Sequence, residues 1–155
     1  MAHITKTGQL GLNLIRKFEG FYAKPYLCPA GIPTIGYGAT YYPNGKRVTL
    51  QDAAITEQQA EEMLVSMLKT YEQSVDSFTR DDINQNQFDA LVSFTWNTGG
   101  SDTLFKMINT NFSITDCAAW LRSHYTTSGG KVLQGLVNRR NAEAKLFETP
   151  KTSTV

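Results

Sequence analysis

The stretch from Lys17 to Gly38 decides how this chain is interpreted. It reads Lys17-Phe18-Glu19-Gly20-Phe21-Tyr22-Ala23-Lys24-Pro25-Tyr26-Leu27-Cys28-Pro29-Ala30-Gly31-Ile32-Pro33-Thr34-Ile35-Gly36-Tyr37-Gly38. A carboxylate, Glu19, stands where an apolar helix ends, and turn residues and then a glycine-rich run of β type follow it. This order predicts a reactive group at a helix terminus that faces a small glycine-rich sheet.

A small β lobe is predicted for residues of about 20–55. The segment is rich in Gly, Pro, Tyr and Thr. Along part of it, small or polar residues (Thr34, Gly36 and Gly38) alternate with large apolar ones (Ile35 and Tyr37). The alternation predicts two or three short antiparallel strands. Pro43-Asn44-Gly45 predicts a turn, because proline suits the first central position of a turn and glycine follows it.

Helices are predicted on both sides of this lobe. Apolar residues at helical spacing indicate a first helix, about 8–19, that Gly20 can end. Thr56-Glu57-Gln58-Gln59 has the pattern of a capping box and opens a long helix, about 57–79. That helix is expected to link the β lobe to a helical lobe of about 84–148, to which the first helix also belongs.

Size and charge indicate one ordinary globular domain. At 155 residues, with 41% hydrophobic and 19% charged residues, the chain can bury a core. We expect two lobes within this domain and a disordered tail at 149–155. The net charge of +1 argues against a nucleic-acid binder, because that class carries a strong basic footprint.

The cysteines and the N-terminus bear on where the protein is made. We expect free thiols at Cys28 and Cys117, because two cysteines make no disulfide framework and a reducing cytosol disfavours a bridge. No long apolar run opens the chain, so neither a signal peptide nor a membrane span is expected. The protein would then be made in the cytoplasm, and another agent would have to release it toward an outside target.

Glu19 is the candidate general acid. The C-terminus of a helix is already negative, so a carboxyl in the last turn tends to keep its proton. Phe18 and Phe21 could add an apolar environment that acts in the same direction. A glutamate in such a position is more often a solvent-facing side chain at a frayed helix end. The catalytic assignment therefore depends on the surrounding motif.

Three motifs in order resemble those of the phage-type lysozymes (endolysins). Glu19, the position nine residues later, and Thr34 six residues further on match the Glu-Asp-Thr catalytic spacing of that family. Gly31 to Gly36 resembles the family's hairpin. The likeness continues at residues 84–97 and ends at residues 135–147, so it covers roughly residues 10 to 148.

The resemblance implies an α+β, mainly helical lysozyme-like fold. It also implies a glycoside hydrolase that cleaves the β-1,4 bond between N-acetylmuramic acid and N-acetylglucosamine in bacterial peptidoglycan. By the same likeness, Arg139 would orient Glu19 and stabilise its anion, and Tyr37 and Asn97 would contact the substrate. The alternative for Arg139 is one member of an arginine pair on a helix surface. No metal or other cofactor is implied, and the sequence shows no cluster of metal ligands.

Two positions depart from the family pattern: Cys28 stands where the Asp is expected, and Ala39 where a His often follows. A thiol could attack the sugar and form a covalent intermediate, or its thiolate could activate a water held by Thr34. With a reference pKa of about 8.5, only a few per cent of such a thiol is ionised at neutral pH. Cys28 could also be an inert apolar filler, and Thr34 a plain β-branched strand residue.

Two functions of different classes follow from these residues. The first is an endolysin, a monomer that acts on peptidoglycan for host-cell lysis after release through the inner membrane, with no nucleic-acid partner. The second is a peptidoglycan-binding protein of low turnover, or a structural part of a phage particle, with the same fold. The replacement of the family's Asp by Cys28 is the feature that favours the second.

Overall fold

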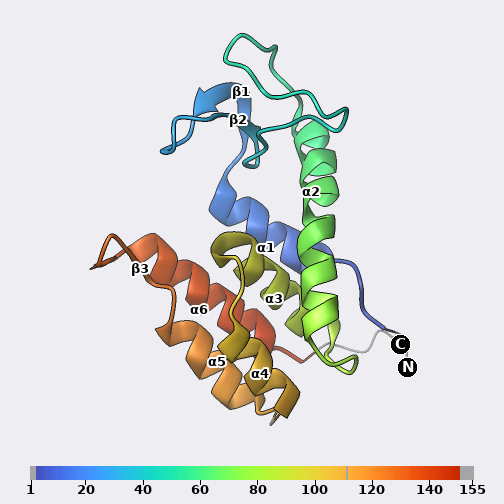
Figure 1. Cartoon of the computed structure of the whole chain (residues 1–155), viewed down its shortest axis with the longest axis vertical. Helices are drawn as coiled ribbons and strands as arrows, with labels where there is room; N and C mark the ends of the chain where they lie inside the picture. The colour runs from blue at the N-terminus through green and yellow to red at the C-terminus, as the bar shows by residue number, and fades with distance from the viewer. Residues whose placement is uncertain (1–2, 111, 151–155) are drawn as a thin grey trace. The chain divides into compact units, whose positions relative to one another are not determined.

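The computed structural model describes residues 3–110 and 112–150. Its helices and strands are shown in Figure 1: α1 (Gln9–Glu19), β1 (Tyr22–Leu27), β2 (Pro33–Gly36), α2 (Glu57–Phe78), α3 (Gln85–Thr98), α4 (Asp102–Thr110), α5 (Ile114–Ser123), β3 (Thr127–Ser128), β4 (Lys131–Val132) and α6 (Gln134–Glu148). The mainly helical α+β class predicted from the sequence is confirmed.

The chain divides into two compact units. The β unit is Ile15–Lys69, and the helical unit is Met1–Leu14 together with Thr70–Val155. The division falls inside α1 and inside α2. The sequence assigned the whole first helix to the helical lobe, whereas the last turn of α1, with Glu19, belongs to the β unit. The predicted tail beyond Pro150 lies outside the described residues.

The β unit is built on the antiparallel pair β1–β2 (Figure 1). Tyr26 lies opposite Thr34, and Tyr22 lies opposite Gly36, with an irregular register between Tyr22 and Tyr26. Pro25 lies in that interval, and its missing N–H cannot extend a regular ladder. The predicted short antiparallel strands are therefore present, with a local bulge that re-aims the side chains.

The predicted turn at Pro43-Asn44-Gly45 is confirmed. The N–H of Gly45 donates to the carbonyl of Tyr42 over 2.9 Å, which puts Pro43 at the second position of a four-residue turn. Below this turn a small core of buried side chains packs together: Ile35, Ala39, Val48 and Met63. These side chains join the β hairpin and the turn to the first half of α2.

The long helix α2 begins with the predicted capping box. The N–H of Thr56 donates to Gln59 Oε1 over 2.8 Å, and the N–H of Gln59 donates to Thr56 Oγ1 over 3.1 Å. Apolar residues at helical spacing along α2 are buried, but Phe78 is 59% exposed. As the last residue of the helix, Phe78 lies past the covered turns and stacks on Phe105 with ring centroids 6.0 Å apart.

In the helical unit, α3 is a largely buried helix. Asn84 and Gln87 form a reciprocal capping box at its start, and Gly99 ends it in the left-handed conformation with φ 88°. Ten of its fourteen residues, from position 86 to 95, are buried. Both α3 and α5 pack on α6, as Figure 1 shows for the neighbouring pair α5 and α6.

A second hairpin, β3–β4, was missed in the sequence. Gly129-Gly130 forms the two-residue turn between Thr127–Ser128 and Lys131–Val132. Both glycines have positive φ, 59° and 79°, which a tight two-residue hairpin of this type requires. The strands are two residues long, so they carry no alternation that a sequence pattern could reveal.

The start of α1 is fixed by a buried carboxylate of α3. Asp89, 1% exposed, accepts hydrogen bonds from the N–H of Gly8 over 2.9 Å and from the N–H of Gly11 over 3.1 Å. An anion is favourable at a helix N-terminus because unpaired N–H groups point toward it. A Cβ on Gly11 would lie 2.6 Å from Asp89 Cβ, so only glycine allows this approach.

Candidate active site

Glu19 is the last residue of α1 and is half-buried. The helix ends because Gly20 adopts the left-handed conformation, φ 76°, in which a residue with a Cβ is disfavoured. The N–H of Gly20 still donates to the carbonyl of Arg16 over 2.9 Å and closes the last turn. The predicted position of Glu19 at a helix terminus is confirmed.

Cys28 lies in the tight loop between β1 and β2. Its N–H donates to the carbonyl of Ile32 over 3.1 Å, and its carbonyl accepts from the N–H of Gly31 over 2.8 Å. Hydrogen bonds lower the pKa of the Cys28 thiol. The largest effect comes from the backbone of Ile32, and smaller ones come from the backbone of Ala30 and the Thr34 side chain, while burial partly opposes them. The loop thus favours the thiolate that either catalytic role requires.

Thr34 lies on β2 and is 3% exposed. Its hydroxyl donates to the Ile32 carbonyl over 2.9 Å, and it is also among the groups that lower the pKa of Cys28. A hydroxyl has one proton, so it cannot donate to both at once. Rotation of the hydroxyl toward the sulfur would therefore accompany ionisation of Cys28, and this couples the two predicted site residues.

Tyr26 belongs to the same site, although the sequence did not single it out. Its Cα is paired with that of Thr34 across the β1–β2 ladder. Burial raises the pKa of Tyr26, and negative charge on Tyr22, Glu19 and Cys28 raises it further. The phenol therefore keeps its proton and lies within electrostatic reach of both Glu19 and Cys28. The sequence offered no local signal for Tyr26, because β1 ends at Leu27 and Cys28 lies in the loop beyond the strand.

The second cysteine has the opposite environment. Cys117 is fully buried in α5, and burial raises the pKa of its thiol to about 11. Both cysteines are free, as predicted. The two thiols of the chain thus differ in reactivity, because the thiolate is the reactive form and only Cys28 has a lowered pKa.

Tyr37 is 2% exposed, and its hydroxyl is shared between Arg16 and Glu57. Little of the side chain is therefore offered to a ligand in this structure. Its burial counts against the contact with substrate, which stays a prediction.

A buried charged network occupies the helical unit. Arg139 and Arg140 are 3% and 0% exposed, so the surface-pair alternative for Arg139 is wrong. Glu143 Oε2 accepts from Ser93 Oγ over 2.5 Å, from Arg139 Nε over 3.3 Å and from Arg140 Nη2 over 3.1 Å. Arg140 Nη2 also donates to Asn97 Oδ1 over 2.8 Å. Asn97 is itself exposed, and its contact with substrate stays a prediction.

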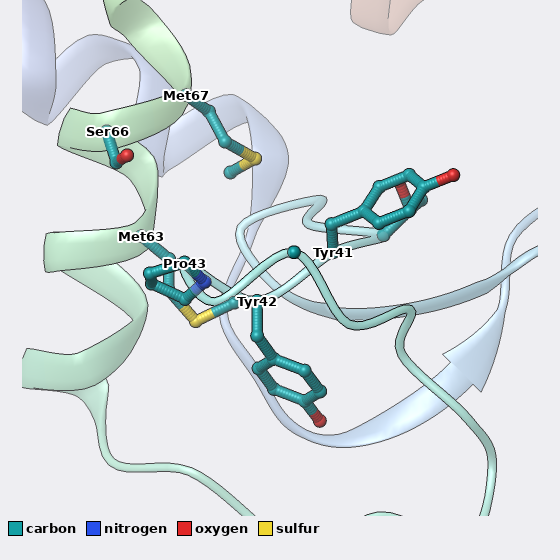
Figure 2. A pocket seen from close by; sticks show the side chains of 8 residues that line it. Tyr41, Tyr42, Pro43, Met63, Ser66 and Met67 are labelled. Atoms are coloured by element: carbon teal, nitrogen blue, oxygen red, sulfur yellow. The ribbon is translucent and has the colours of Figure 1, made fainter.

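A pocket of about 230 Å³ lies beside α2 in the β unit (Figure 2). Aromatic, proline and methionine side chains dominate its labelled wall: Tyr41, Tyr42, Pro43, Met63 and Met67. The Tyr42 hydroxyl donates to Asp52 Oδ2 over 2.7 Å, and burial, aided by this bond, raises the pKa of Tyr42 to about 12. None of Glu19, Cys28 and Thr34 lines this pocket.

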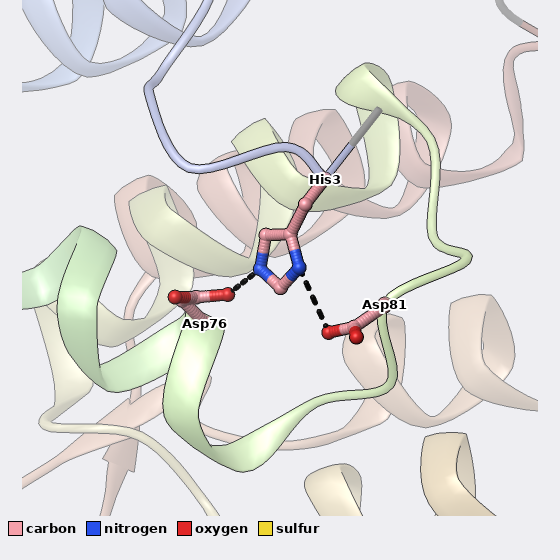
Figure 3. Close-up of side chains that lie close together, drawn as sticks. All are labelled: His3, Asp76 and Asp81. Carbon is pink, nitrogen blue, oxygen red and sulfur yellow. Dashed lines mark hydrogen bonds and ion pairs between the residues drawn. The ribbon is translucent and has the colours of Figure 1, made fainter. Parts of the chain in front are cut away.

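His3 lies between two carboxylates in the helical unit (Figure 3). Its Nε2 pairs with Asp76 Oδ1, and its Nδ1 lies 3.0 Å from Asp81 Oδ1. One ligand atom from each of the three side chains falls within 4.8 Å of the others, so the group could hold a metal ion. The two ring nitrogens, however, face different carboxylates, which is the arrangement of a protonated imidazole donating twice.

We expect His3 to stabilise the fold at low pH and not at high pH. The hydrogen bond to Asp76, with the charges of Asp76 and Asp81, raises the pKa of His3 above its ordinary 6.5. A raised folded-state pKa gives stability that is present below the unfolded pKa and is lost as the pH rises through the folded pKa. His3→Gln should therefore lower the melting temperature at about pH 5 and leave it unchanged at about pH 9.

The matched control is His124→Gln, which removes the other histidine of the chain. It should not reproduce the pH-dependent difference. A His3→Gln variant whose melting temperature falls equally at both pH values would show that the imidazole acts by packing. Restoration of stability by added Zn²⁺ at high pH in the parent protein alone would instead show that the three side chains hold a metal.

Comparison with known proteins assigns the family. A model of the phage lysozyme family matches residues 16–143, which include the α1 terminus, the Cys28 hairpin and the buried arginines. The chain belongs to the phage lysozyme family. The predicted resemblance is therefore confirmed.

Individual phage lysozymes and endolysins are similar over most of the chain. The endolysin of Bacillus phage PZA is 40% identical over 154 residues, which cover 92% of this chain and 56% of that protein. The endolysin of Salmonella phage P22 is 33% identical, covering 88% of this chain and 94% of the relative. The solved endolysin of Escherichia coli O157:H7 phage FAHEc1 is 33% identical with a TM-score of 0.80, covering 94% of each chain.

The relatives differ from this chain, or from one another, in length and in type. The chain spans little more than half the length of the endolysins of Bacillus phages PZA and B103. Some family relatives are called SAR-endolysins, among them one from Haemophilus phage HP1. Within the part of this chain that the structure describes, no helix has the length and apolar character needed to cross a membrane.

Proposed function

We propose that this phage lysozyme is an endolysin that hydrolyses the β-1,4 bond between N-acetylmuramic acid and N-acetylglucosamine in peptidoglycan. The observation that carries the proposal is the loop that binds the Cys28 thiol. A lowered pKa at the position of the family's Asp, beside Thr34 and within electrostatic reach of Tyr26, supports a reactive thiol at Cys28.

Glu19 is proposed as the general acid and Cys28 as its partner. In the covalent route, the thiolate attacks the anomeric carbon while the bond to the leaving oxygen breaks and takes the proton of Glu19. Water then hydrolyses the thioglycoside, and the Glu19 carboxylate accepts the proton of that water. In the other route, the thiolate removes a proton from a water held near Thr34. This water attacks the anomeric carbon in one step, while the bond to the leaving oxygen breaks and that oxygen takes the proton of Glu19.

Arg139 is proposed to orient Glu19 and to stabilise its anion after proton transfer. The family resemblance suggests this role, and the bonds of Arg139 to Glu143 and Ser93 hold its guanidinium in place within the helical unit. Asn97, exposed and bonded to Arg140, is proposed as a substrate contact. No cofactor takes part in either route.

The cheapest test is the loss of turbidity of permeabilised Gram-negative cells, with an assay for new reducing ends in isolated peptidoglycan. Lysis that releases reducing ends at N-acetylmuramic acid is expected. Saturable binding to the wall without lysis would favour the alternative, a peptidoglycan-binding or phage structural protein with this fold.

The cysteine variants are the sharper experiment. Cys28→Ala should lose most activity, about 10²-fold or more, because no group then replaces the thiolate. Cys28→Asp should stay active, since a carboxylate is ionised at neutral pH and restores the family pattern. Activity of the parent enzyme should rise with pH through the pKa of the thiol, and Cys28→Asp should not need that rise. Initial lysis rates across the pH range measure both effects.

Cys117→Ala is the matched control, because it removes the other thiol, whose pKa is raised to about 11. This variant should keep its activity, and a thiol-blocking reagent should still inactivate it by reaction at Cys28. Bound substrate should protect Cys28 from the reagent. Retention of anomeric configuration would support the thioglycoside, and inversion would support the water route. Full activity in Cys28→Ala would overturn both roles.

The protein is proposed to act as a monomer, without nucleic acid. It is also proposed to be made in the host cytoplasm and to reach peptidoglycan after release through the inner membrane. The near-neutral net charge supports the absence of nucleic acid. Light scattering of the purified protein and fractionation of cells before lysis would test the oligomeric state and the compartment.

A further inference from the structure

Arg16 makes a branched set of contacts one turn before Glu19. Its Nε donates to the Tyr37 hydroxyl over 3.2 Å, and its Nη2 lies 3.3 Å from Glu57 Oε2 and 2.7 Å from Glu61 Oε1. The partners come from the segment after β2 and from the first turns of α2. One guanidinium thus connects the end of α1 with two other elements of the β unit.

Tyr37 closes this set into a hydrogen-bonded ring of three side chains, those of Arg16, Tyr37 and Glu57. Its hydroxyl accepts from Arg16 and donates to Glu57 Oε2 over 2.8 Å, so both of its hydrogen-bonding functions are used. The ring of Tyr37 is also held from two sides, with Arg16 Cζ 5.6 Å and the Phe21 centroid 5.7 Å from its own centroid. A 2% exposed tyrosine with such contacts has one defined position.

The ion pairs of Arg16 add little stability. The side chains of Arg16, Glu57 and Glu61 are 27%, 56% and 43% exposed. Ion pairs at such exposure contribute between zero and about 1 kcal/mol. The hydrogen-bonded ring instead fixes the position of two segments relative to each other. Arg16 lies three residues before Glu19, and Tyr37 lies three residues after Thr34, so the ring joins the segments that carry these two site residues.

We propose that Arg16, Tyr37 and Glu57 are positioning residues that hold the Glu19-bearing end of α1 in register with the Cys28–Thr34 hairpin. The proposal rests on the hydrolase function proposed above. It gives Tyr37 a role other than the substrate contact that its place in the motif suggested. Loss of the ring should let Glu19 move while the hairpin and the rest of the fold persist.

Tyr37→Phe tests this, because it removes only the hydroxyl. Initial rates against the concentration of isolated peptidoglycan should show kcat falling by about tenfold to a hundredfold with KM unchanged, since small misplacements of a catalytic group have effects of this size. The melting temperature should change by no more than about 4 °C, the shift that about 1 kcal/mol causes in a chain of this length.

Tyr41→Phe is the matched control. Tyr41 also packs against an arginine, with Arg47 Cζ 5.4 Å from its ring, but it is exposed. Its kcat and KM should equal those of the parent. Arg16→Lys should recover more of kcat than Arg16→Gln, and the effects of Tyr37→Phe and Glu57→Gln on ln kcat should not add, because both break the same ring.

Amide hydrogen exchange gives a readout that does not depend on activity. The N–H of Gly20, bonded to the Arg16 carbonyl, should exchange faster in Tyr37→Phe and not in Tyr41→Phe. A raised KM with unchanged kcat would make Tyr37 a substrate contact and overturn the positioning role, as would unchanged kinetics. Failure of the hydrolase proposal itself would show earlier, as a parent protein that does not lyse cells.

Discussion

Glu19→Gln is expected to abolish lysis while the fold survives. The amide has nearly the size of the carboxyl but cannot give a proton to the leaving oxygen of the sugar. General acids of this kind contribute about 10²–10⁴-fold, so initial lysis rates should fall at least a hundredfold. The melting temperature and the binding to isolated peptidoglycan should stay near those of the parent, because Glu19 is the last, half-buried residue of α1.

Glu62→Gln is the control for the loss of one negative charge in the β unit. Glu62 is exposed on α2 and should tolerate the change in both activity and stability. If Glu19→Gln keeps more than about a tenth of the parent rate, the general-acid assignment is wrong. Cys28 and a Thr34-bound water would then have to act without that acid.

The parts of the fold that the sequence predicted are those whose side chains bond to the nearby backbone. Thr56 and Gln59, and likewise Asn84 and Gln87, announce helix starts because the bonds form within three residues. The β3–β4 hairpin was missed because its strands are too short for a pattern. The exposure of Phe78 was missed because spacing along a helix cannot show where covering elements end.

The candidate site was predicted as far as its motif reaches. Glu19, Cys28 and Thr34 were chosen by spacing, and their roles stay predictions. The sequence could not show that the loop amides lower the pKa of Cys28, because this depends on the backbone of residues 30 and 32. Tyr26 was missed because its pairing with Thr34 depends on where the loop between β1 and β2 begins and ends. Bonds between side chains 20 to 41 residues apart likewise leave no local signal.

Glu143→Gln is expected to lower the free energy of unfolding by about 3–5 kcal/mol, the cost of removing one partner from a buried ion pair. Glu143 is fully buried and faces two buried guanidiniums, those of Arg139 and Arg140. Burial raises the pKa of the Glu143 carboxyl, and Arg140, Ser93 and Arg139 oppose that rise. Without the Glu143 carboxylate, the positive charges of Arg139 and Arg140 would lie in the core of the helical unit and would lose the anion that now pairs with both.

Glu148→Gln is the matched control, because Glu148 is also on α6 and also pairs with an arginine, Arg122. Both side chains of that pair are 40% exposed, so its loss should cost no more than about 1 kcal/mol. Urea unfolding of the two variants measures the difference. Glu143→Asp keeps the charge and should recover part of the loss.

The comparison of the two glutamate variants separates charge from shape. Gln at position 143 can still accept from Ser93 but cannot neutralise Arg139 or Arg140, so a large loss means that the negative charge is what the core requires. Equal losses in Glu143→Gln and Glu148→Gln would contradict this. The buried arginines would then be stabilised chiefly by neutral partners, such as the Asn97 amide oxygen and the ring of Phe94 5.1 Å from Arg140 Cζ.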